Sequence, residues 1–114
     1  MRKTIVYQTL NTENNKIYIG VHLQENPEIF DGYLGCGFYI NHNYYIENPK
    51  VPLHFAIKKY GVKKFKRTTL AIYDTYEEAL ALEAKLVNEE FIKRKDTYNV
   101  TLGGNGGSYL FPIN

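Results

Sequence analysis

Apolar and polar residues alternate near the start of the chain in a way that predicts a β-hairpin. Segments 4–10 (TIVYQTL) and 16–22 (KIYIGVH) are rich in β-branched and aromatic residues, and the residues between them have turn composition. If Leu10 pairs with Asn15, Tyr7 lies opposite Tyr18.

Alternation of side chains along a strand then groups several polar side chains on one side of the predicted hairpin. Tyr18, Gly20 and His22 are spaced by two residues, so they share a face with Tyr7. Two phenols and an imidazole are therefore expected together.

The middle of the chain has irregular patterning followed by two regular elements. Residues 23–51 contain prolines, glycines and many aromatic side chains, which predicts an ordered excursion with one short strand or helix. Pro52 is suited to the first turn of a helix over 52–60, which Gly61 ends. Segment 65–73 (FKRTTLAIY) then predicts a third strand.

A long amphipathic helix is predicted after this strand. Thr75 and Glu78 have the spacing of a capping box, and the helical pattern continues to about Lys95. At 100° per residue, Glu83 lies at the centre of the apolar face. A carboxylate that points into the core needs a compensating partner, and the candidates are Arg94, Lys16, a proton or a metal ion. The alternative is that Glu83 forms a salt bridge or lies at the rim of the core, where water still reaches it.

Three further predictions concern Glu90, Cys36 and the glycine-rich stretch near the end of the chain. Glu90 has Arg94 four residues later as an ion-pair partner. Cys36 is expected to be a small buried residue. The glycine-rich stretch 103–107 could cradle a phosphate, but it lacks the lysine and helix of a P-loop and is interpreted as a flexible exit from the domain.

Composition limits the class of protein. The chain has 114 residues, of which 44% are hydrophobic and 23% charged, so one globular domain is expected. With the strands and helices predicted above, it is an α+β domain over residues 1–107, with 108–114 as a tail or the start of a linker. A single cysteine excludes a disulfide framework and indicates a reducing compartment. No long apolar run predicts a membrane span or a secretion signal.

Positive charge is concentrated in one short segment despite a net charge of only +2. Its members are Lys58, Lys59, Lys63, Lys64, Lys66 and Arg67. Interleaved with aromatic residues, such a segment suits a surface that contacts nucleic-acid phosphates. An ordinary solvated helix end and strand is the alternative.

These residues together resemble the GIY-YIG nucleases. Segment 5–7 (IVY) and segment 18–20 (YIG) correspond to the two-part signature, the first part being degenerate. The resemblance continues through segments 32–37 and 56–61, Phe65, the helix with Glu83, and residues 98–99, and covers roughly residues 4–107. It is strongest to catalytic domains of phage and mobile-intron homing endonucleases.

The resemblance implies a fold and a set of roles. The expected fold is a small three-stranded antiparallel sheet flanked by helices. Tyr7 matches the tyrosine that activates water, Tyr18 its hydrogen-bonding companion, Glu83 the single ligand of Mg²⁺ or Mn²⁺, and Asn99 the asparagine that supports the site. His22 is a further candidate for contact with the phosphate or the nucleophile.

One position of the family pattern is left unassigned. The family places an arginine on a helix after its second motif, but this sequence has no arginine between Gly20 and Arg67. Lysine lacks the guanidinium fork, so no residue takes over this role.

The sequence therefore predicts a metal-dependent endonuclease acting on double-stranded DNA in the cytoplasm, the host's if the protein is phage-encoded. Homing endonucleases carry a separate DNA-binding region, for which 114 residues leave no room, so an excised or solitary catalytic module is expected. A non-cleaving nucleic-acid-binding module and a structural interaction protein are the alternatives.

Overall fold

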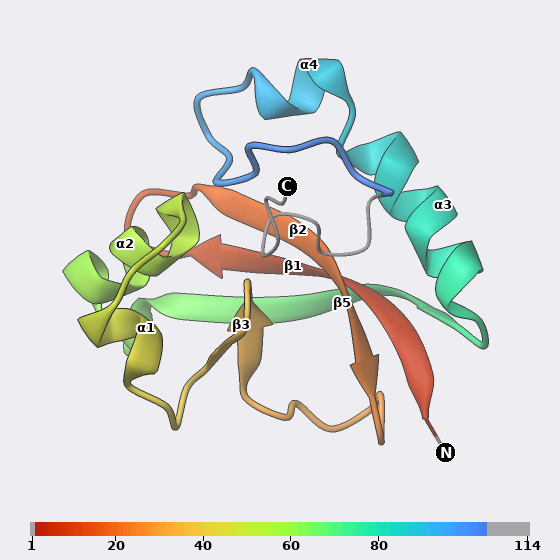
Figure 1. Ribbon diagram of the computed structural model, residues 1–114, viewed down its shortest axis with the longest axis horizontal. Helices are drawn as coiled ribbons and strands as arrows, with labels where there is room; N and C mark the ends of the chain where they lie inside the picture. The colour runs from red at the N-terminus through yellow and green to blue at the C-terminus, as the bar shows by residue number, and fades with distance from the viewer. Residues whose placement is uncertain (1, 105–114) are drawn as a thin grey trace.

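The computed structural model describes residues 2–104 and confirms the α+β class. Its centre is a three-stranded antiparallel sheet in the order β2-β1-β5 (Figure 1). The strands are β1 (Lys3–Asn11), β2 (Ile17–Gln24) and β5 (Phe65–Tyr73). All three agree with the predicted segments to within two residues at each end.

The irregular middle segment forms a second, smaller sheet and a short helix. Strands β3 (Tyr33–Gly35) and β4 (Phe38–Tyr39) pair antiparallel, and α1 (Tyr44–Glu47) follows. Tyr33 and Phe38 are buried beside β1, which explains why this aromatic-rich segment is ordered. Cys36, between these two strands, is buried as predicted.

Helix α2 (Pro52–Tyr60) has the predicted bounds. Pro52 is in its first turn, and Gly61 ends it with a φ of 90°. A short 3-10 helix, η1 (Val62–Lys64), leads from there into β5.

The hairpin register differs from the predicted one by two residues. Leu10 pairs with Ile17 rather than Asn15, and Tyr7 therefore lies opposite Gly20. The turn takes up more chain because Asn15 has a left-handed backbone with a φ of 64° and donates its N–H to the carbonyl of Asn11. A shift of two preserves the faces, so the predicted grouping of side chains holds.

The predicted long helix is in fact two helices. Helix α3 (Tyr76–Leu86) begins at the predicted capping box, and α4 (Glu89–Ile92) follows after a break. Asn88 causes the break by capping α4, because its Oδ1 accepts the N–H of Phe91 at 2.9 Å. Val87 and Phe91 are both buried on either side of the break.

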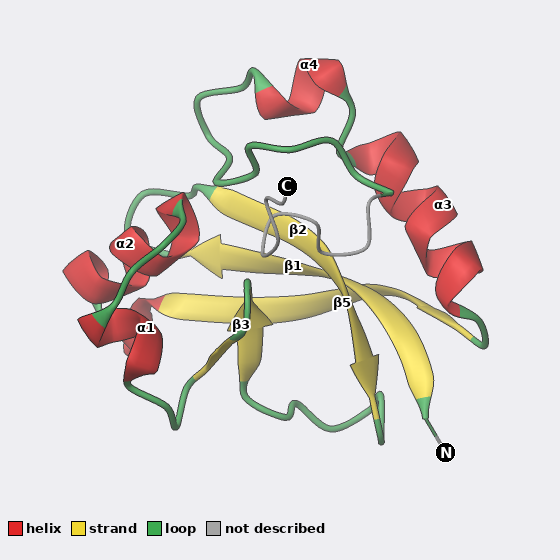
Figure 2. Ribbon diagram, viewed as in Figure 1, coloured by secondary structure: helices red, strands yellow, loops and turns green. Residues whose placement is uncertain are grey.

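The sheet separates two hydrophobic clusters. Ile5 and Tyr7 belong to the cluster beneath α2 and β3, whereas Val6 and Ile19 belong to the cluster beneath α3 and α4. In Figure 2, α1 and α2 lie to the left of the sheet, and α3 and α4 lie above it and to its right. We call the first side the tyrosine face and the second the helical face.

Candidate active site

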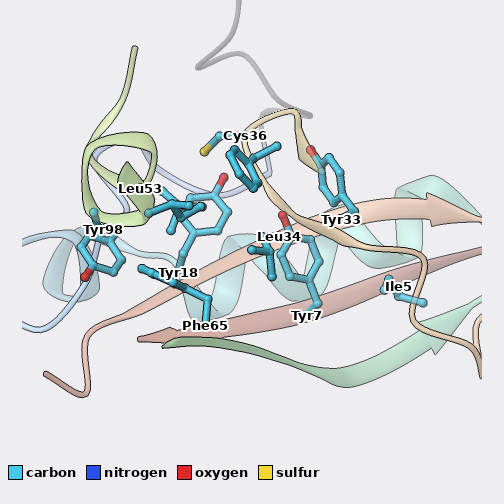
Figure 3. Packing of buried hydrophobic residues seen from close by; sticks show 12 residues of the cluster. Ile5, Tyr7, Tyr18, Tyr33, Leu34, Cys36, Leu53, Phe65 and Tyr98 are labelled. Carbon is cyan, nitrogen blue, oxygen red and sulfur yellow. The ribbon is translucent and has the colours of Figure 1, made fainter. Parts of the chain in front are cut away.

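Two tyrosines pack together over a glycine on the tyrosine face. The ring centroids of Tyr7 and Tyr18 are 6.3 Å apart, and both residues are buried. A Cβ atom on Gly20 would lie 2.7 Å from the Tyr7 hydroxyl oxygen and 3.0 Å from the Tyr18 ring, so only glycine fits there. Figure 3 shows both hydroxyl groups on the same side of the strands, pointing away from them.

His22 extends this group toward the end of β2. Its ring stacks on Tyr33 with 3.9 Å between centroids, and the same Tyr33 meets Tyr7 edge to face at 6.0 Å. Nε2 of His22 lies 2.7 Å from Oδ2 of Asp31. The structure thus brings Tyr7, Tyr18 and His22 together on the tyrosine face, as predicted, in a group of rings that also includes Tyr33.

Asp31 is a member of the site that the sequence showed only as part of a turn. Partial burial by itself raises its pKa, but hydrogen bonds from His22 and the Tyr33 N–H, together with the charge of Arg67, hold that pKa below its usual value. Asp31 is therefore a carboxylate over the whole neutral range.

Arg67 is the clearest correction to the predicted surface. It was assigned to a phosphate-binding segment, yet its side chain is only 3% exposed. In the register, Arg67 pairs with Thr9, which directs it to the tyrosine face. Its guanidinium donates to Asp31, to the Gln24 side chain and to the Tyr33 carbonyl at 3.2, 2.8 and 3.1 Å.

The guanidinium also lies 5.7 Å from the centre of the Tyr7 ring. Burial lowers the pKa of Arg67, and the charge of Asp31 opposes this. An arginine is thus present at the site after all, contributed by β5 rather than by a helix. Finding it from the sequence would require the pairing of β5 with β1, which no local pattern gives.

Glu83 is buried in α3, as predicted, but its partner is a backbone group. Its Oε1 accepts the N–H of Gly104 at 2.9 Å. The proposed partner Arg94 instead forms an ion pair with Asp96, at 2.7 Å between Nη2 and Oδ2. The predicted pairing of Glu90 with Arg94 is therefore also wrong, because α4 ends at Ile92 before a second turn forms.

Burial raises the pKa of Glu83, and the hydrogen bond from Gly104 only partly opposes this. Such a carboxyl group gains from a nearby cation. Gly103 lies so close to α3 that a Cβ on it would be 2.3 Å from the Glu83 carbonyl oxygen. The first two glycines of the stretch are thus packed on α3 and are not a flexible exit, while residues 105–107 lie outside the described part of the chain.

Asn99 joins the segment before these glycines to the outer edge of β2. Its side chain accepts the N–H of Ile19 at 2.9 Å and donates to the Ile19 carbonyl at 2.8 Å. Because Ile19 lies between Tyr18 and Gly20, Asn99 fixes the part of β2 that carries Tyr18. This geometry is that of a positioning residue.

The other cationic side chains of the predicted segment are exposed and belong to α2, η1 and β5. They are Lys58, Lys59, Lys63, Lys64 and Lys66. Lys64 is paired with Glu13 at 3.0 Å, and Lys59 lies over the Tyr60 ring at 5.3 Å. We call these five residues the lysine surface.

The arrangement can hold a metal ion only through few protein ligands. Within residues 2–104, no three side chains of the histidine, cysteine, aspartate and glutamate types gather at one place. Glu83 supplies the oxygen ligand that a hard cation such as Mg²⁺ prefers, and Mg²⁺ usually keeps several waters and uses one or two carboxylates. Glu83 is on the helix that covers the helical face, and the 99–104 segment connects it to β2.

None of the helices in the described chain is both long and apolar enough to cross a membrane.

The chain is similar to part of several proteins that are named as endonucleases and come from Enterobacteria phage T4. No protein-family model and no solved structure matches it.

Three of these relatives show the extent of the similarity. The chain is 43% identical over 110 residues to "Putative endonuclease segD", 41% identical over 101 residues to "Putative endonuclease segB", and 35% identical over 101 residues to "Endonuclease segA". These matches cover 95%, 89% and 89% of the chain but only 42%, 39% and 39% of the relatives. The chain therefore spans about two fifths of the length of these relatives.

Proposed function

We propose that this chain is the catalytic module of a GIY-YIG-like endonuclease that hydrolyses phosphodiester bonds in double-stranded DNA. The observation that supports this best is the packing of Tyr7 and Tyr18 over Gly20. The absence of a side chain at Gly20 leaves room for the Tyr7 hydroxyl group beside the Tyr18 ring, and simple packing of apolar rings would not need that hydroxyl group. The T4 relatives named as endonucleases support the same class of reaction.

The side chains can divide the chemistry as follows. The Tyr7 hydroxyl orients and activates the attacking water, Tyr18 supports it, and Asn99 keeps β2, the strand of Tyr18, in place. Glu83 would hold one Mg²⁺ or Mn²⁺ ion, which supplies positive charge to the phosphate oxygens. The lysine surface would contact the DNA backbone.

Two further expectations belong to this proposal. Because the relatives are longer than this chain, we propose that a separate DNA-binding region selects the target site. The protein would act where phage DNA is present, in the cytoplasm of an infected cell.

A substitution in Glu83 tests the proposal most directly. The wild type is expected to nick or linearise supercoiled plasmid with Mg²⁺, and Glu83→Gln is expected to lose this activity while the circular dichroism spectrum is unchanged. Glu89→Gln is the matched control, because Glu89 is an exposed glutamate near the same helix end. Water-proton relaxation with Mn²⁺ checks binding separately, and Glu83→Gln should reduce the bound fraction. Cutting by Glu83→Gln at the wild-type rate would disprove the metal-ligand role.

A non-cleaving DNA-binding module is the second candidate, because the lysine surface is exposed whatever the tyrosines do. This function would be supported by duplex binding with a steep salt dependence and no cutting in Mg²⁺ or Mn²⁺.

A further inference from the structure

Three side chains from separate elements form a chain of charge contacts that ends on His22. His22 is on β2, Asp31 is in the loop before β3, and Arg67 is on β5. The two Asp31 oxygens are divided between them: Oδ2 lies 2.7 Å from His22 Nε2, and Oδ1 lies 3.2 Å from Arg67 Nη1. The side chains of His22, Asp31 and Arg67 are 11%, 31% and 3% exposed.

The loop conformation strengthens this arrangement. Asp31 Oδ1 also accepts the N–H of Tyr33, which fixes the carboxylate beside the ring on which His22 stacks. Arg67 is held in turn by Gln24 and by the Tyr33 carbonyl. Burial of a guanidinium group costs free energy, and the three acceptors around Arg67 offset that cost. A charged group held this firmly is suited to fixing the orientation of Asp31.

We propose that Asp31 and Arg67 are positioning residues that fix His22 as its Nε2–H tautomer, so that Nδ1 accepts a hydrogen bond from the water that attacks the DNA phosphate. A carboxylate oxygen only accepts, so the short contact requires the proton to be on Nε2. Within residues 2–104 no hydrogen bond engages Nδ1. The inference rests on the proposed nuclease function.

The charges around the ring determine which partner Nδ1 takes. Arg67 balances the charge of Asp31, so the imidazole need not be a cation to satisfy the carboxylate. The other titratable groups that face the ring are Tyr33, stacked on it, and Tyr39 at 6.2 Å. A neutral ring with its proton on Nε2 cannot donate from Nδ1 to a phosphate oxygen. Of the two contacts considered for His22, phosphate or nucleophile, this geometry selects the nucleophile.

Nitrogen-15 NMR of the free protein tests the tautomer without any reaction. Imidazole shifts distinguish the Nε2–H ring, the Nδ1–H ring and the imidazolium, and the Nε2–H pattern is expected for His22 at pH 7.5. Either of the other two patterns would overturn the inference. Because no DNA is present, a failure here is separate from a failure of the proposed endonuclease activity, which would show as absent cutting by the wild type.

Asp31→Asn connects the tautomer to the reaction. An amide can present its Nδ2–H to Nε2, so the proton of His22 is expected to move to Nδ1, and cutting is expected to fall roughly a hundredfold or more. The matched control is Asp96→Asn, which removes the carboxylate of the exposed Arg94–Asp96 pair and should leave cutting unchanged. Unchanged cutting by a folded Asp31→Asn would overturn the role of His22.

Arg67→Met gives a second, independent variant. It keeps an unbranched apolar stem but releases Asp31 Oδ1, so the carboxylate is held less firmly against His22 and cutting should fall about tenfold or more. Arg94→Met serves as its control. If both variants fail to fold, the nitrogen-15 spectrum of the wild type still decides the inference.

Discussion

The two faces of the sheet are built from different kinds of side chain. The helical face packs Val6 and Ile19 against Ala79, Val87 and Phe91, all of them apolar. The tyrosine face buries two phenols, an imidazole and a guanidinium close to one another. The apolar cluster of the helical face has the usual composition of a protein core, and the tyrosine face does not.

Buried polar groups reduce stability unless they are hydrogen-bonded, so the tyrosine face is costly to build. The structure meets this cost with many specific contacts, such as those of Arg67 with three oxygen acceptors. We infer a division of labour: the apolar contacts of the helical face hold the fold together, and the tyrosine face carries most of the proposed chemistry, with Glu83 on α3 as the exception. Substitutions on each face should therefore affect different measurements.

Tyr7→Phe is expected to have the largest effect on activity and only a small effect on stability. Loss of the hydroxyl should lower the cutting rate roughly 10²- to 10⁴-fold, the usual range for a general acid or base. The ring stays in place, so the free energy of unfolding should change by about 1 kcal/mol. Plasmid cutting and urea unfolding measure the two quantities.

Tyr98→Phe is the control for this prediction. Tyr98 is also buried, and its hydroxyl accepts a hydrogen bond from Asn11 at 3.0 Å, so a similar loss of stability is expected without the loss of activity. Equal cutting by the two variants would mean that the tyrosine face is only a polar core.

Phe91→Ala should show the opposite pattern on the helical face. Removal of this buried ring leaves a cavity between α4 and the sheet, which costs about 3–5 kcal/mol of unfolding free energy. Cutting per folded molecule should be unchanged at a temperature where the variant is folded. Phe55→Ala, at a ring that is 56% exposed, should cost much less. A selective loss of cutting in Phe91→Ala would contradict the division between the faces.

The smallest expected effect concerns the pH dependence of stability at Glu83. Because burial raises its pKa above the unfolded value, the folded state binds more protons between the two pKa values. Stability is then lost as pH rises from the unfolded value of about 4.3 through the folded one. Glu83→Gln keeps an oxygen for the Gly104 N–H and avoids this loss, so it should be the more stable protein at pH 7 and equal to the wild type near pH 3.

Urea midpoints between pH 3 and pH 8 measure this difference. Glu89→Gln is exposed and should give a flat difference over the same range. A Glu83→Gln variant that is less stable than the wild type at pH 7 would show that the carboxylate has a stabilising partner besides Gly104.

Local signals in the sequence were sufficient for most of the fold. Period-two alternation located the three strands, and Pro52, Gly61 and the Thr75 capping box located the helix ends, because each acts on its own backbone. The break at Asn88 does not show in the sequence because apolar residues continue at helical spacing through it. The hydrogen bond from the Phe91 N–H to the Asn88 side chain reveals the cap.

The candidate site was predictable only in part, for a related reason. Face parity put Tyr7, Tyr18 and His22 together even with the wrong register, since an error of two residues leaves every side chain on its face. Asp31 and Arg67 were missed because their contacts join a loop to a distant strand. Their partners depend on how β5 pairs with β1, which no local pattern encodes.

The side chain of Asn99 has a consequence beyond holding β2 in place. An outer strand presents unpaired peptide groups that can recruit a strand from another molecule. By offering one acceptor and one donor to Ile19, Asn99 imitates a peptide unit, while the Tyr98 N–H donates to the Ile17 carbonyl at 2.8 Å. The same amide that steadies the hairpin therefore also blocks that part of the β2 edge from intermolecular β-pairing, the first step toward aggregation.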